Sequence, residues 1–484
     1  MSSTVIRYLG LAGSVLLVIA GRLGGALPAA DLGATPASVA RGPYGPAILI
    51  CWLVGTGLHA YAWWSGRDRN LSVRWVLVTA ALWTLPFLAA PPMGSRDVYS
   101  YACQGQMFQY GADPYRHGVG ALPCTWIDTV STNWRDTVTP YGPLFILIAA
   151  AAVTVGGGLT GAILMFRLIA LAGIVTVAVG LPTLARRCGV PPQRALWLAL
   201  AGPLVGAHLL GAPHNDAIML GAAVAALLLT VRARARALWL LAAGALLGLA
   251  ISVKLTALVI VPFAVLAAGP PPTTNPATGW LAAVTAAARP LARPFTLVAG
   301  GVTAALTTVS LASGLGWGWI PATGVGASLV QFTSPPTAVG MTATYLGRTV
   351  HPGFDAVPVV RAVAVALLAA TLVCLWWRAH RDPDRTRAAL HGAALALAAT
   401  VLFAPVLHPW YVLWPLTLLA ATTVRTKPIM LVTVACAFSV LPDGGGLARF
   451  VKFPGAPLAT VLLAVLLVVA VRRRTASAQP AASV

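Results

Sequence analysis

The sequence predicts an all-α integral membrane protein that crosses a lipid bilayer many times. Hydrophobic residues make up 58% of the 484 positions and charged residues only 9%, which leaves too few polar side chains to cover a water-soluble surface. About fourteen apolar runs follow one another, and each approaches the roughly 20 residues that a helix needs to cross the hydrocarbon core. We therefore expect about 13 to 14 transmembrane helices in a single domain of residues 1–484.

The apolar runs are separated by short polar connections, so each is read as a helix of its own. They lie at about 5–22, 46–64, 74–91, 160–184, 195–212, 216–231, 236–252, 255–268, 295–312, 357–378, 388–406, 411–424, 428–441 and 457–471. A further run at 141–156 is rich in Ala and Gly. Whether it crosses decides the orientation of every later segment.

The basic residues predict that orientation. The net charge of +21 comes from small groups of Arg and Lys between apolar runs, which indicates membrane topology and argues against nucleic acid. If residues 141–156 form an interfacial or re-entrant helix, most of the 32 basic residues face the cytoplasm. We expect a multi-pass plasma-membrane protein with both termini cytoplasmic, a tail at 472–484 and an inner linker at 269–294. The long loops at 92–156 and 313–356 are then extracytoplasmic.

The first long outer loop carries most of the candidate chemical groups. The chain has eleven acidic residues, all of them aspartates, and four lie in this loop. Aromatic rings stack on sugar faces and charged groups bind hydroxyls, so the loop suits a sugar site. An interfacial aromatic belt explains the rings, but not an aspartate directly after a predicted membrane helix. The candidate residues are Arg96, Asp97, Tyr99, Tyr101, Asp113, Tyr115 and Tyr141.

Three later helix junctions add polar groups on the same expected side. A lysine at bilayer depth costs about 2.5 to 3.5 kcal/mol, so it has a partner, such as an anionic lipid headgroup, unless it snorkels to the interface. A histidine there would donate to phosphate or be packed and hydrogen-bonded. Arg167, inside its helix, either pairs with a carboxylate or functions directly. The junction residues are His214, Asn215, Asp216, Lys254, His408, Trp410 and Tyr411.

Cysteines and aspartates limit the possible cofactors. The six cysteines have no spacing that would build a zinc site, and no metal is expected. Cys103 and Cys124 lie in one loop and would form a disulfide in an oxidising compartment or remain two thiols. Asp382 and Asp384 alone have an Asp-x-Asp spacing, but they lie among inner arginines. A nucleotide-sugar donor is therefore disfavoured.

Taken in order, these motifs resemble a known family. They are Ser-Arg-Asp-Val-Tyr-Ser-Tyr at 95–101, Gly-Ala-Asp-Pro-Tyr at 111–115, Pro-Tyr-Gly-Pro-Leu at 140–144, His-Asn-Asp at 214–216, Val-Lys-Leu at 253–255 and His-Pro-Trp-Tyr at 408–411. The chain resembles the actinobacterial polyprenol-phosphate-mannose-dependent alpha-1,6-mannosyltransferases that elongate the mannan of lipomannan and lipoarabinomannan. These are GT-C membrane glycosyltransferases, and the first loop is the most specific part of the match.

The resemblance implies a GT-C fold, polyprenyl phosphate mannose as the donor and a mannan or phosphatidylinositol mannoside as the acceptor. It implies that Asp97 is the general base, and that Lys254 lies at the lipid phosphate with some of Arg96, His214 and His408. No cofactor or divalent metal is expected. Two helices before the one leading into the loop, and residues 104–109, depart from the family pattern. We expect the sugars to contact Tyr99, Tyr101, Asp113, Tyr115, Tyr141, Asn215, Asp216, Trp410 and Tyr411.

The chemistry of this donor requires only one carboxylate. The leaving phosphate is a weak base that needs no general acid, so one aspartate that deprotonates the acceptor hydroxyl suffices and the anomeric carbon inverts. Two alternatives remain open at this level. One is a transferase of another sugar on the same lipid, such as arabinose or glucose. The other is a lipid or solute transporter in which Lys254, Arg167 and Asp216 are coupling charges, although the decorated outer loop argues against it.

Overall fold

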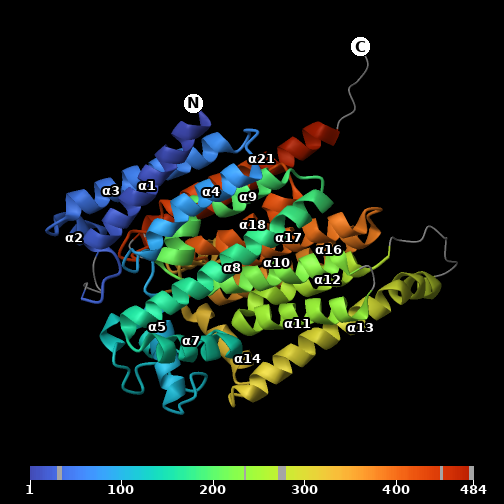
Figure 1. Ribbon diagram of the computed structural model, residues 1–484, viewed down its shortest axis with the longest axis horizontal. Coiled ribbons are helices and arrows are strands. Elements are labelled where there is room, and N and C mark those ends of the chain that lie inside the picture. The colour runs from blue at the N-terminus through green and yellow to red at the C-terminus, as the bar shows by residue number, and fades with distance from the viewer. Residues whose placement is uncertain (30–34, 234–235, 271–279, 447–450, 479–484) are drawn as a thin grey trace. The chain divides into compact units, whose positions relative to one another are not determined.

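The computed structural model describes residues 1–29, 35–233, 236–270, 280–446 and 451–478. Within these ranges the regular structure is helical and no β-strand forms (Figure 1). The helices before the middle of the chain are α1 (Ser3–Gly24), α2 (Pro36–Arg41), α3 (Gly45–Gly66), α4 (Val73–Thr84), η1 (Leu85–Leu88), α5 (Asp97–Gln109), η2 (Ile127–Thr129), α6 (Thr132–Arg135), α7 (Pro143–Gly156), α8 (Leu159–Arg187), α9 (Pro192–Leu200), η3 (Val205–Gly211), α10 (Asp216–Arg232) and α11 (Ala237–Val253).

The second half of the chain continues in the same way. Its helices are η4 (Leu255–Ile260), α12 (Val261–Ala268), α13 (Trp280–Ala312), α14 (Trp319–Ala322), η5 (Thr323–Ser328), α15 (Pro335–Gly347), α16 (Val357–Arg381), α17 (Arg385–Phe403), η6 (Pro409–Val412), α18 (Leu413–Thr422), α19 (Lys427–Ala437) and α21 (Lys452–Ala478). Each apolar run of the sequence coincides with a helix or a helix pair. The predicted all-α membrane protein is confirmed.

Seven helices among the described residues are long and apolar enough to cross a membrane. They are α1, α3, α8, residues Arg289–Ala312 of α13, α16, α17 and residues Lys452–Arg472 of α21. The pair α9 and η3, bent by 60°, would make an eighth span. Other apolar helices, such as α11 and α19, have only 10 to 17 residues. A count of about 13 to 14 spans depends on whether these shorter helices cross, and it stays a prediction.

Helix breaks explain the shorter elements. The helical hydrogen-bond ladder ends at Thr84 just before Pro86, and at Leu200 just before Pro203, because proline has no N–H to donate. The α7 helix has 14 residues and is about 21 Å long, whereas the hydrocarbon core is about 30 Å thick. Hydropathy alone detects none of these breaks, since the residues on both sides are apolar.

The expected inner linker is partly wrong. Residues 280–294 belong to α13, which includes Pro290 and Pro294, because their alanine-rich sequence has high helix propensity. The rest of the linker at 271–279 lies outside the described residues. The expected cytoplasmic tail begins inside α21, which continues to Ala478, and residues 479–484 lie outside the described part.

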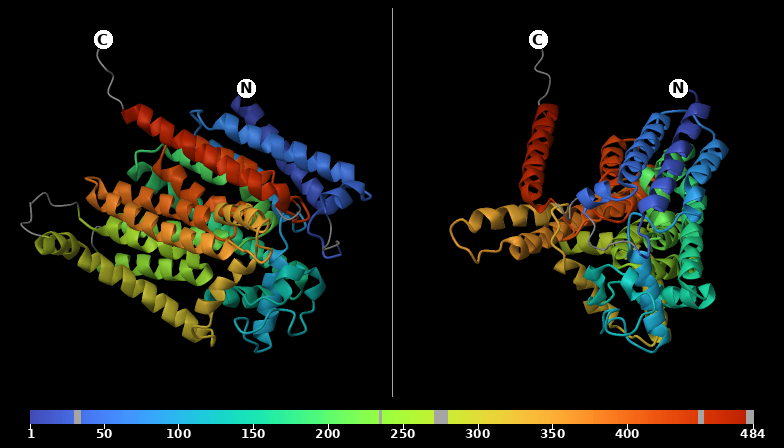
Figure 2. Two further views of the ribbon diagram at one scale, coloured as in Figure 1. Left: turned by 180° about the vertical axis from the view of Figure 1, so that it is seen from behind. Right: turned by 90° about the vertical axis from the view of Figure 1, so that its left-hand side faces the viewer.

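The described chain divides into two compact units. The first comprises residues 1–325, 372–398 and 409–445, and the second comprises residues 326–371, 399–408 and 446–484. In the first unit α1 packs along α3 and α4, while α8, α10, α11 and α13 pack in sequence (Figures 1 and 2). The α5 and α7 helices pack together, and α7 also contacts α8 and α11. This arrangement brings the first long loop to the ends of the α8 to α11 helices.

Small residues allow these helices to approach closely. A Cβ atom added to Gly173 would lie 2.3 Å from the carbonyl oxygen of Ala217, and one on Gly244 would lie 2.2 Å from that of Val298. Both distances are shorter than real contacts allow. In lipid, helices associate through such close packing and not through the hydrophobic effect. These glycines therefore fix the α8–α10 and α11–α13 contacts.

The second unit has its own small core. Helix α15 packs on α21, and Met341, Val357 and Ala456 are buried between them with Phe332 and Tyr345 alongside. Arg361 joins the segment before α15 to the segment after α17, because it donates to the carbonyl oxygens of residues 329 and 405 at 2.6 and 3.1 Å.

Candidate functional site

Four helix breaks in the first unit carry the candidate site. Asp97 begins α5, just after Gly94, whose φ of 74° favours glycine. Asp216 begins α10 after the π-helical turn η3, and π-helical turns are frequent at functional sites. Lys254 adopts an extended conformation between α11 and η4. Tyr411 lies in η6, which leads into α18.

Asp97 is largely enclosed. Its side chain is 17% exposed, and its carboxylate oxygen Oδ2 lies 3.6 Å from Nε2 of His214. The backbone N–H of Asp97 donates to Oγ of Ser95 at 3.1 Å, which fixes the start of the helix. Burial raises the pKa of Asp97 to about 6, against the opposing effect of the Lys254 charge. The carboxylate is therefore a stronger base than an exposed aspartate.

His214 is held in one orientation. Its Nδ1 lies 2.6 Å from the carbonyl oxygen of His208, and because a carbonyl only accepts, Nδ1 must carry the proton. The ring is stacked on Trp410, with centroids 3.9 Å apart and planes at 23°. The Nε2 atom of His214 therefore faces Asp97. At 3.6 Å the two groups are within ion-pair distance but are not hydrogen-bonded.

A buried ion pair lies on the neighbouring helices. Nζ of Lys254 is 2.8 Å from Oδ1 of Asp216, whose side chain is fully buried. The indole N–H of Trp414 donates to the same oxygen. The ammonium group also lies 4.6 Å from the ring centroid of Tyr411 and 4.9 Å from that of Trp414, within cation–π range. In the structure the partner of Lys254 is thus a protein carboxylate framed by two rings, and the predicted contact of Lys254 with a lipid phosphate stays a prediction.

A cluster of aromatic side chains joins α5 to α7 and α8. The ring of Tyr101 makes edge contacts with Tyr141, Phe145 and Phe166 at centroid distances of 5.4, 4.7 and 5.8 Å. Burial, together with the nearby Asp97 charge, raises the pKa of both tyrosines well above the usual range. Their hydroxyls therefore stay protonated, as hydrogen-bond donors.

Several buried polar atoms in these segments have no hydrogen-bond partner in the described structure. Both amide atoms of Asn215, which is 1% exposed, are unsatisfied, and so is Oδ2 of Asp216. Each such atom costs about 1 to 3 kcal/mol, so a protein retains such atoms only for a reason. Sugar hydroxyls would satisfy them. The others on α5 and α11 are Ser100 Oγ, Gln104 Oε1 and Ser252 Oγ.

Some predicted site residues also make contacts that hold the loop together, and their contact with a substrate stays a prediction. Arg96 donates to the carbonyl oxygens of Thr129 and Leu27, each at 3.0 Å, and it lies near the Tyr99 ring. The buried hydroxyl of Tyr99 donates to the carbonyl oxygen of residue 26. Asp113 accepts from the backbone N–H of Tyr115 at 2.8 Å. These contacts fix the path of the first long loop.

Two further predicted residues are not part of the contacts described above. Tyr115 is buried beside Gly318, and its hydroxyl has no partner among the described residues. His408 belongs to the second unit, so its contribution stays a prediction. Of the two possibilities for Arg167, pairing with a carboxylate is not found among the described residues. Its guanidinium donates to the carbonyl oxygens of residues 88, 210 and 211 at 2.8 to 3.1 Å, because the broken helices η1 and η3 leave these carbonyls unpaired.

The two loop cysteines are joined. Cys103 on α5 and Cys124 form a disulfide with a Cα–Cα distance of 5.5 Å, which decides between the two possibilities that the sequence leaves open. The bridge ties α5 to the segment before η2. Gln106 adds two hydrogen bonds to Thr125 beside it, at 2.8 and 3.0 Å.

Sequence reasoning missed His208 and Trp414. Both lie inside apolar runs, where a single histidine or tryptophan is usually a packing residue, and only their contacts with His214 and Asp216 reveal them. Proximity to the His-Asn-Asp and Pro-Trp-Tyr motifs was the one available signal.

Comparison with known proteins gives a consistent result. The family profile described as the N-terminal domain of alpha-(1->6)-mannopyranosyltransferase matches residues 7–270, and the MptB C-terminal domain profile matches residues 336–470. The first match includes Asp97, His214, Asp216 and Lys254. No solved structure matches the chain.

Several relatives with the same family name are similar in sequence over most of this chain. Alpha-(1->6)-mannopyranosyltransferase A of Mycobacterium tuberculosis is 31% identical over 90% of this chain and 84% of its own. A probable alpha-(1->6)-mannopyranosyltransferase of Mycolicibacterium smegmatis is 30% identical over 97% of this chain and 88% of its own. Alpha-(1->6)-mannopyranosyltransferase B of Corynebacterium glutamicum is 28% identical over 81% and 69%, respectively.

Proposed function

This chain belongs to the alpha-(1->6)-mannopyranosyltransferase family, and we propose that it moves mannose from polyprenyl phosphate mannose onto a growing alpha-1,6-mannan of lipomannan or lipoarabinomannan. The acceptor is the mannan chain or a phosphatidylinositol mannoside. A donor carried on a membrane lipid suits a site built at the ends of membrane helices. The observation that carries the proposal is the enclosed Asp97 carboxylate, 3.6 Å from Nε2 of His214.

Asp97 acts as the general base. Its ionised carboxylate removes the proton from the acceptor hydroxyl as that oxygen attacks the anomeric carbon, opposite the departing phosphate. The configuration inverts, so a beta-linked donor gives an alpha linkage. The phosphate leaves as a weak base and needs no acid. One carboxylate with a raised pKa is enough for this reaction.

His214 extends the base. Because its Nδ1 proton is fixed on the His208 carbonyl, Nε2 can accept the proton that Asp97 has taken up. The resulting imidazolium would lie on the face of Trp410, which stabilises a cation. Both ring nitrogens are then occupied, so we assign the donor phosphate to Lys254 in the first place. Its ammonium group has three donors, and Asp216 takes one of them.

Two observations support an extracytoplasmic site. The disulfide between Cys103 and Cys124 lies in the loop that carries Asp97, and disulfides persist in oxidising compartments. Arginine-rich turns lie at the other ends of the same helices, for example Arg186 and Arg187 at the end of α8, as the positive-inside rule requires for the cytoplasmic face. Cytoplasmic termini follow from this orientation.

The test is mannose transfer by the purified protein from synthetic polyprenyl phosphate mannose to a short alpha-mannoside. Asp97→Asn keeps the shape but loses the base, and we expect transfer to fall by about 10² to 10⁴. Asp128→Asn is the matched control, because Asp128 lies in the same loop with its side chain 96% exposed. It should leave transfer unchanged.

Other results would point elsewhere. Full activity of Asp97→Asn would move the base to Asp113 or Asp216. Transfer from arabinose or glucose donors, but not from mannose, would change the sugar and keep the chemistry. Uptake of labelled lipid into vesicles without any transfer would favour the transporter.

A further inference from the structure

A basic cavity lies at a helix turn of the first unit, away from the candidate site. The turn between α16 and α17 and the end of α18 line an open cavity of about 620 Å³. Its charged lining consists of Arg378, Arg387, Arg425, Asp382 and Asp384, with His391 beside them. Nothing in the proposed transfer reaction uses these residues.

The cavity and the candidate site lie at opposite ends of one helix. Trp414, which donates to Asp216, is the second residue of α18, and Thr422, which lines the cavity, is the last. The segment formed by η4 and α12 runs in the same direction. It begins next to Lys254 and ends near residue 267, whose carbonyl oxygen accepts a hydrogen bond from Thr386 of α17. The cavity therefore lies at the opposite end of these helices from the residues around Asp216 and Lys254.

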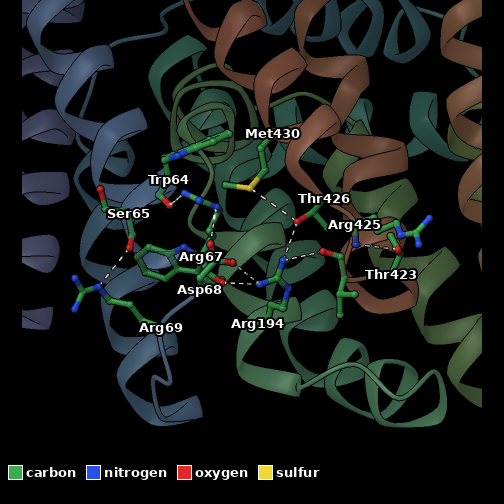
Figure 3. Close-up of polar contacts among 12 residues, drawn as sticks. Trp64, Ser65, Arg67, Asp68, Arg69, Arg194, Thr423, Arg425, Thr426 and Met430 are labelled. Atoms are coloured by element: carbon green, nitrogen blue, oxygen red, sulfur yellow. Dashed lines mark hydrogen bonds and ion pairs between the residues drawn. The ribbon is translucent and has the colours of Figure 1, made fainter. Parts of the chain in front are cut away.

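Three guanidinium groups in this cavity have no partner. Among the described residues, the side chains of Arg378, Arg387 and Arg425 make no hydrogen bond or ion pair; Arg387 and Arg425 bond only through their backbone N–H groups. Figure 3 shows Arg425 with its guanidinium turned away from the polar cluster around Arg194. Like-charged groups that line one cavity repel one another. An anion bound between them removes that repulsion.

The acidic residues do not neutralise these arginines. Asp384 is bound by both terminal nitrogens of Arg187, at 2.9 and 3.2 Å, so its charge is already balanced. Asp382 accepts from the backbone N–H of Asp384. The five charged residues of the lining therefore sum to +1, and Arg187, outside the lining, offsets the charge of Asp384.

The backbone around the cavity is held in place by other arginines. Buried Arg385 donates to the carbonyl oxygens of residues 380 and 270 at 3.2 and 2.6 Å, which fixes the α16–α17 turn. Arg194 donates to the carbonyl oxygen of Val424 at 3.0 Å and to the hydroxyl of Thr426 at 3.2 Å (Figure 3). The segment that carries Arg425 is thus fixed on both sides. The site is formed before any ligand binds.

We propose that this cavity binds a phosphate group, held by the guanidinium groups of Arg378, Arg387 and Arg425. Guanidinium matches the oxygens of a phosphate with paired hydrogen bonds. Helices α16 and α17 both meet the requirements of a membrane span, so their turn lies where lipid headgroups are, and basic pockets between membrane helices suit such headgroups. Leu375 and Leu395 extend the lining along the helices with apolar surface for an acyl chain. The same chemistry would accept a soluble phosphate.

The experiment measures ligand binding to the full-length protein, delipidated in an uncharged detergent. Phosphatidylglycerol, phosphatidylcholine, glycerol 3-phosphate and inorganic phosphate are titrated separately, with native mass spectrometry and thermal unfolding as readouts. The variant R378Q/R387Q/R425Q removes the three donors. The control R69Q/R186Q/R236Q removes the same charge from exposed arginines outside the cavity.

Phosphatidylglycerol should bind the wild type at least about tenfold more tightly than phosphatidylcholine does, since a hydrogen bond to a charged group is worth about a factor of ten or more. The cavity variant should lose this preference, and the control should keep it within about twofold. Binding of glycerol 3-phosphate or inorganic phosphate with the same dependence, without lipid binding, would identify a soluble phosphate as the source. Equal binding by the cavity variant and the control would overturn the proposal.

The single variant R425Q tests whether a loss of binding in the triple variant comes from misfolding. Because the Arg425 side chain is exposed and makes no hydrogen bond, its loss should not change the unfolding temperature of the ligand-free protein. It should still lower the affinity for phosphatidylglycerol, or for the soluble phosphate, by about tenfold. Unchanged affinity of R425Q would remove Arg425 from the site and contradict the proposal as stated.

Discussion

Lys254 and Asp216 form an ion pair of 2.8 Å in which the aspartate is fully buried and the lysine is 12% exposed. The two residues come from different helices, α10 and the α11–η4 break. Removing one partner of such a pair leaves an uncompensated charge, whereas removing both does not. The pair therefore both holds the site together and sets its charge.

We expect Lys254→Met to lower the free energy of unfolding by about 3 to 5 kcal/mol. The double variant Lys254→Met/Asp216→Asn should recover a large part of that loss, because no bare carboxylate remains. The wild type, Lys254→Met, Asp216→Asn and the double variant form a double-mutant cycle. Their thermal unfolding in one detergent gives the coupling free energy between the two residues. Additive effects of the two substitutions would mean that the ion pair contributes nothing to stability.

The raised pKa of Asp97 predicts how transfer depends on pH. Burial raises that pKa to about 6, and only the ionised carboxylate can act as a base. The rate should therefore be constant above about pH 7 and fall by roughly tenfold per unit below pH 6. An exposed aspartate would keep its activity down to about pH 4. Measuring kcat/KM between pH 4.5 and 8, with the Asp128→Asn protein as control, distinguishes the two.

His214→Gln tests the proposed proton acceptor. Glutamine can still bond to the His208 carbonyl but cannot take up a proton, so kcat should fall by about 10- to 100-fold, with KM for the donor nearly unchanged. The matched control is His208→Gln, which keeps the backbone carbonyl that fixes the ring of His214. A rise in KM for the donor with kcat preserved would instead place His214 at the phosphate.

The sequence was sufficient for the parts of the fold that depend on composition. Apolar runs predicted the long membrane helices but not the helices inside the two long loops, such as α5 and α15. The acidic residue after a span drew attention to Asp97 before any geometry was available. The breaks inside apolar runs were not visible, because Leu85 and Val205 are as apolar as their neighbours and only the hydrogen-bond ladder distinguishes them.

The pairings within the site were equally hidden. Asp216 and Lys254 are 38 residues apart, and a charge pattern does not say which carboxylate meets which ammonium. Arg167 shows the same difficulty, since its partners are three backbone carbonyls that only broken helices leave exposed. Local sequence thus identifies the chemical groups, and tertiary packing decides their roles.

The disulfide between Cys103 and Cys124 closes a loop of 21 residues, which corresponds to a stabilisation of about 3 kcal/mol. We expect Cys103→Ser/Cys124→Ser to unfold at a clearly lower temperature than the wild type. A reducing agent should lower the unfolding temperature of the wild type by the same amount and leave that of the variant unchanged. The control Cys51→Ser removes a free thiol and should have little effect. Equal unfolding temperatures of all three proteins would show that the bridge does not stabilise the loop.

We expect substitution of Asn215 to have opposite effects on stability and on activity. Its side chain is 1% exposed and neither amide atom has a partner among the described residues, so the protein without substrate bears the cost of two desolvated polar atoms. Asn215→Leu has similar volume and removes that cost, and it should raise the free energy of unfolding by about 1 kcal/mol or more. If the amide instead binds a sugar hydroxyl, the same substitution should lower kcat/KM by about tenfold or more.

The exposed Asn133 provides the comparison, because Asn133→Leu changes the same atoms on the surface of the same unit. Asn133→Leu should change neither the free energy of unfolding nor kcat/KM appreciably. Thermal unfolding of the substrate-free protein and kcat/KM for the mannoside acceptor are measured on both variants. A stabilised and fully active Asn215→Leu would show that the amide is a packing defect and not part of the sugar site. A destabilised variant would show that the amide is satisfied within the protein, most simply by buried water.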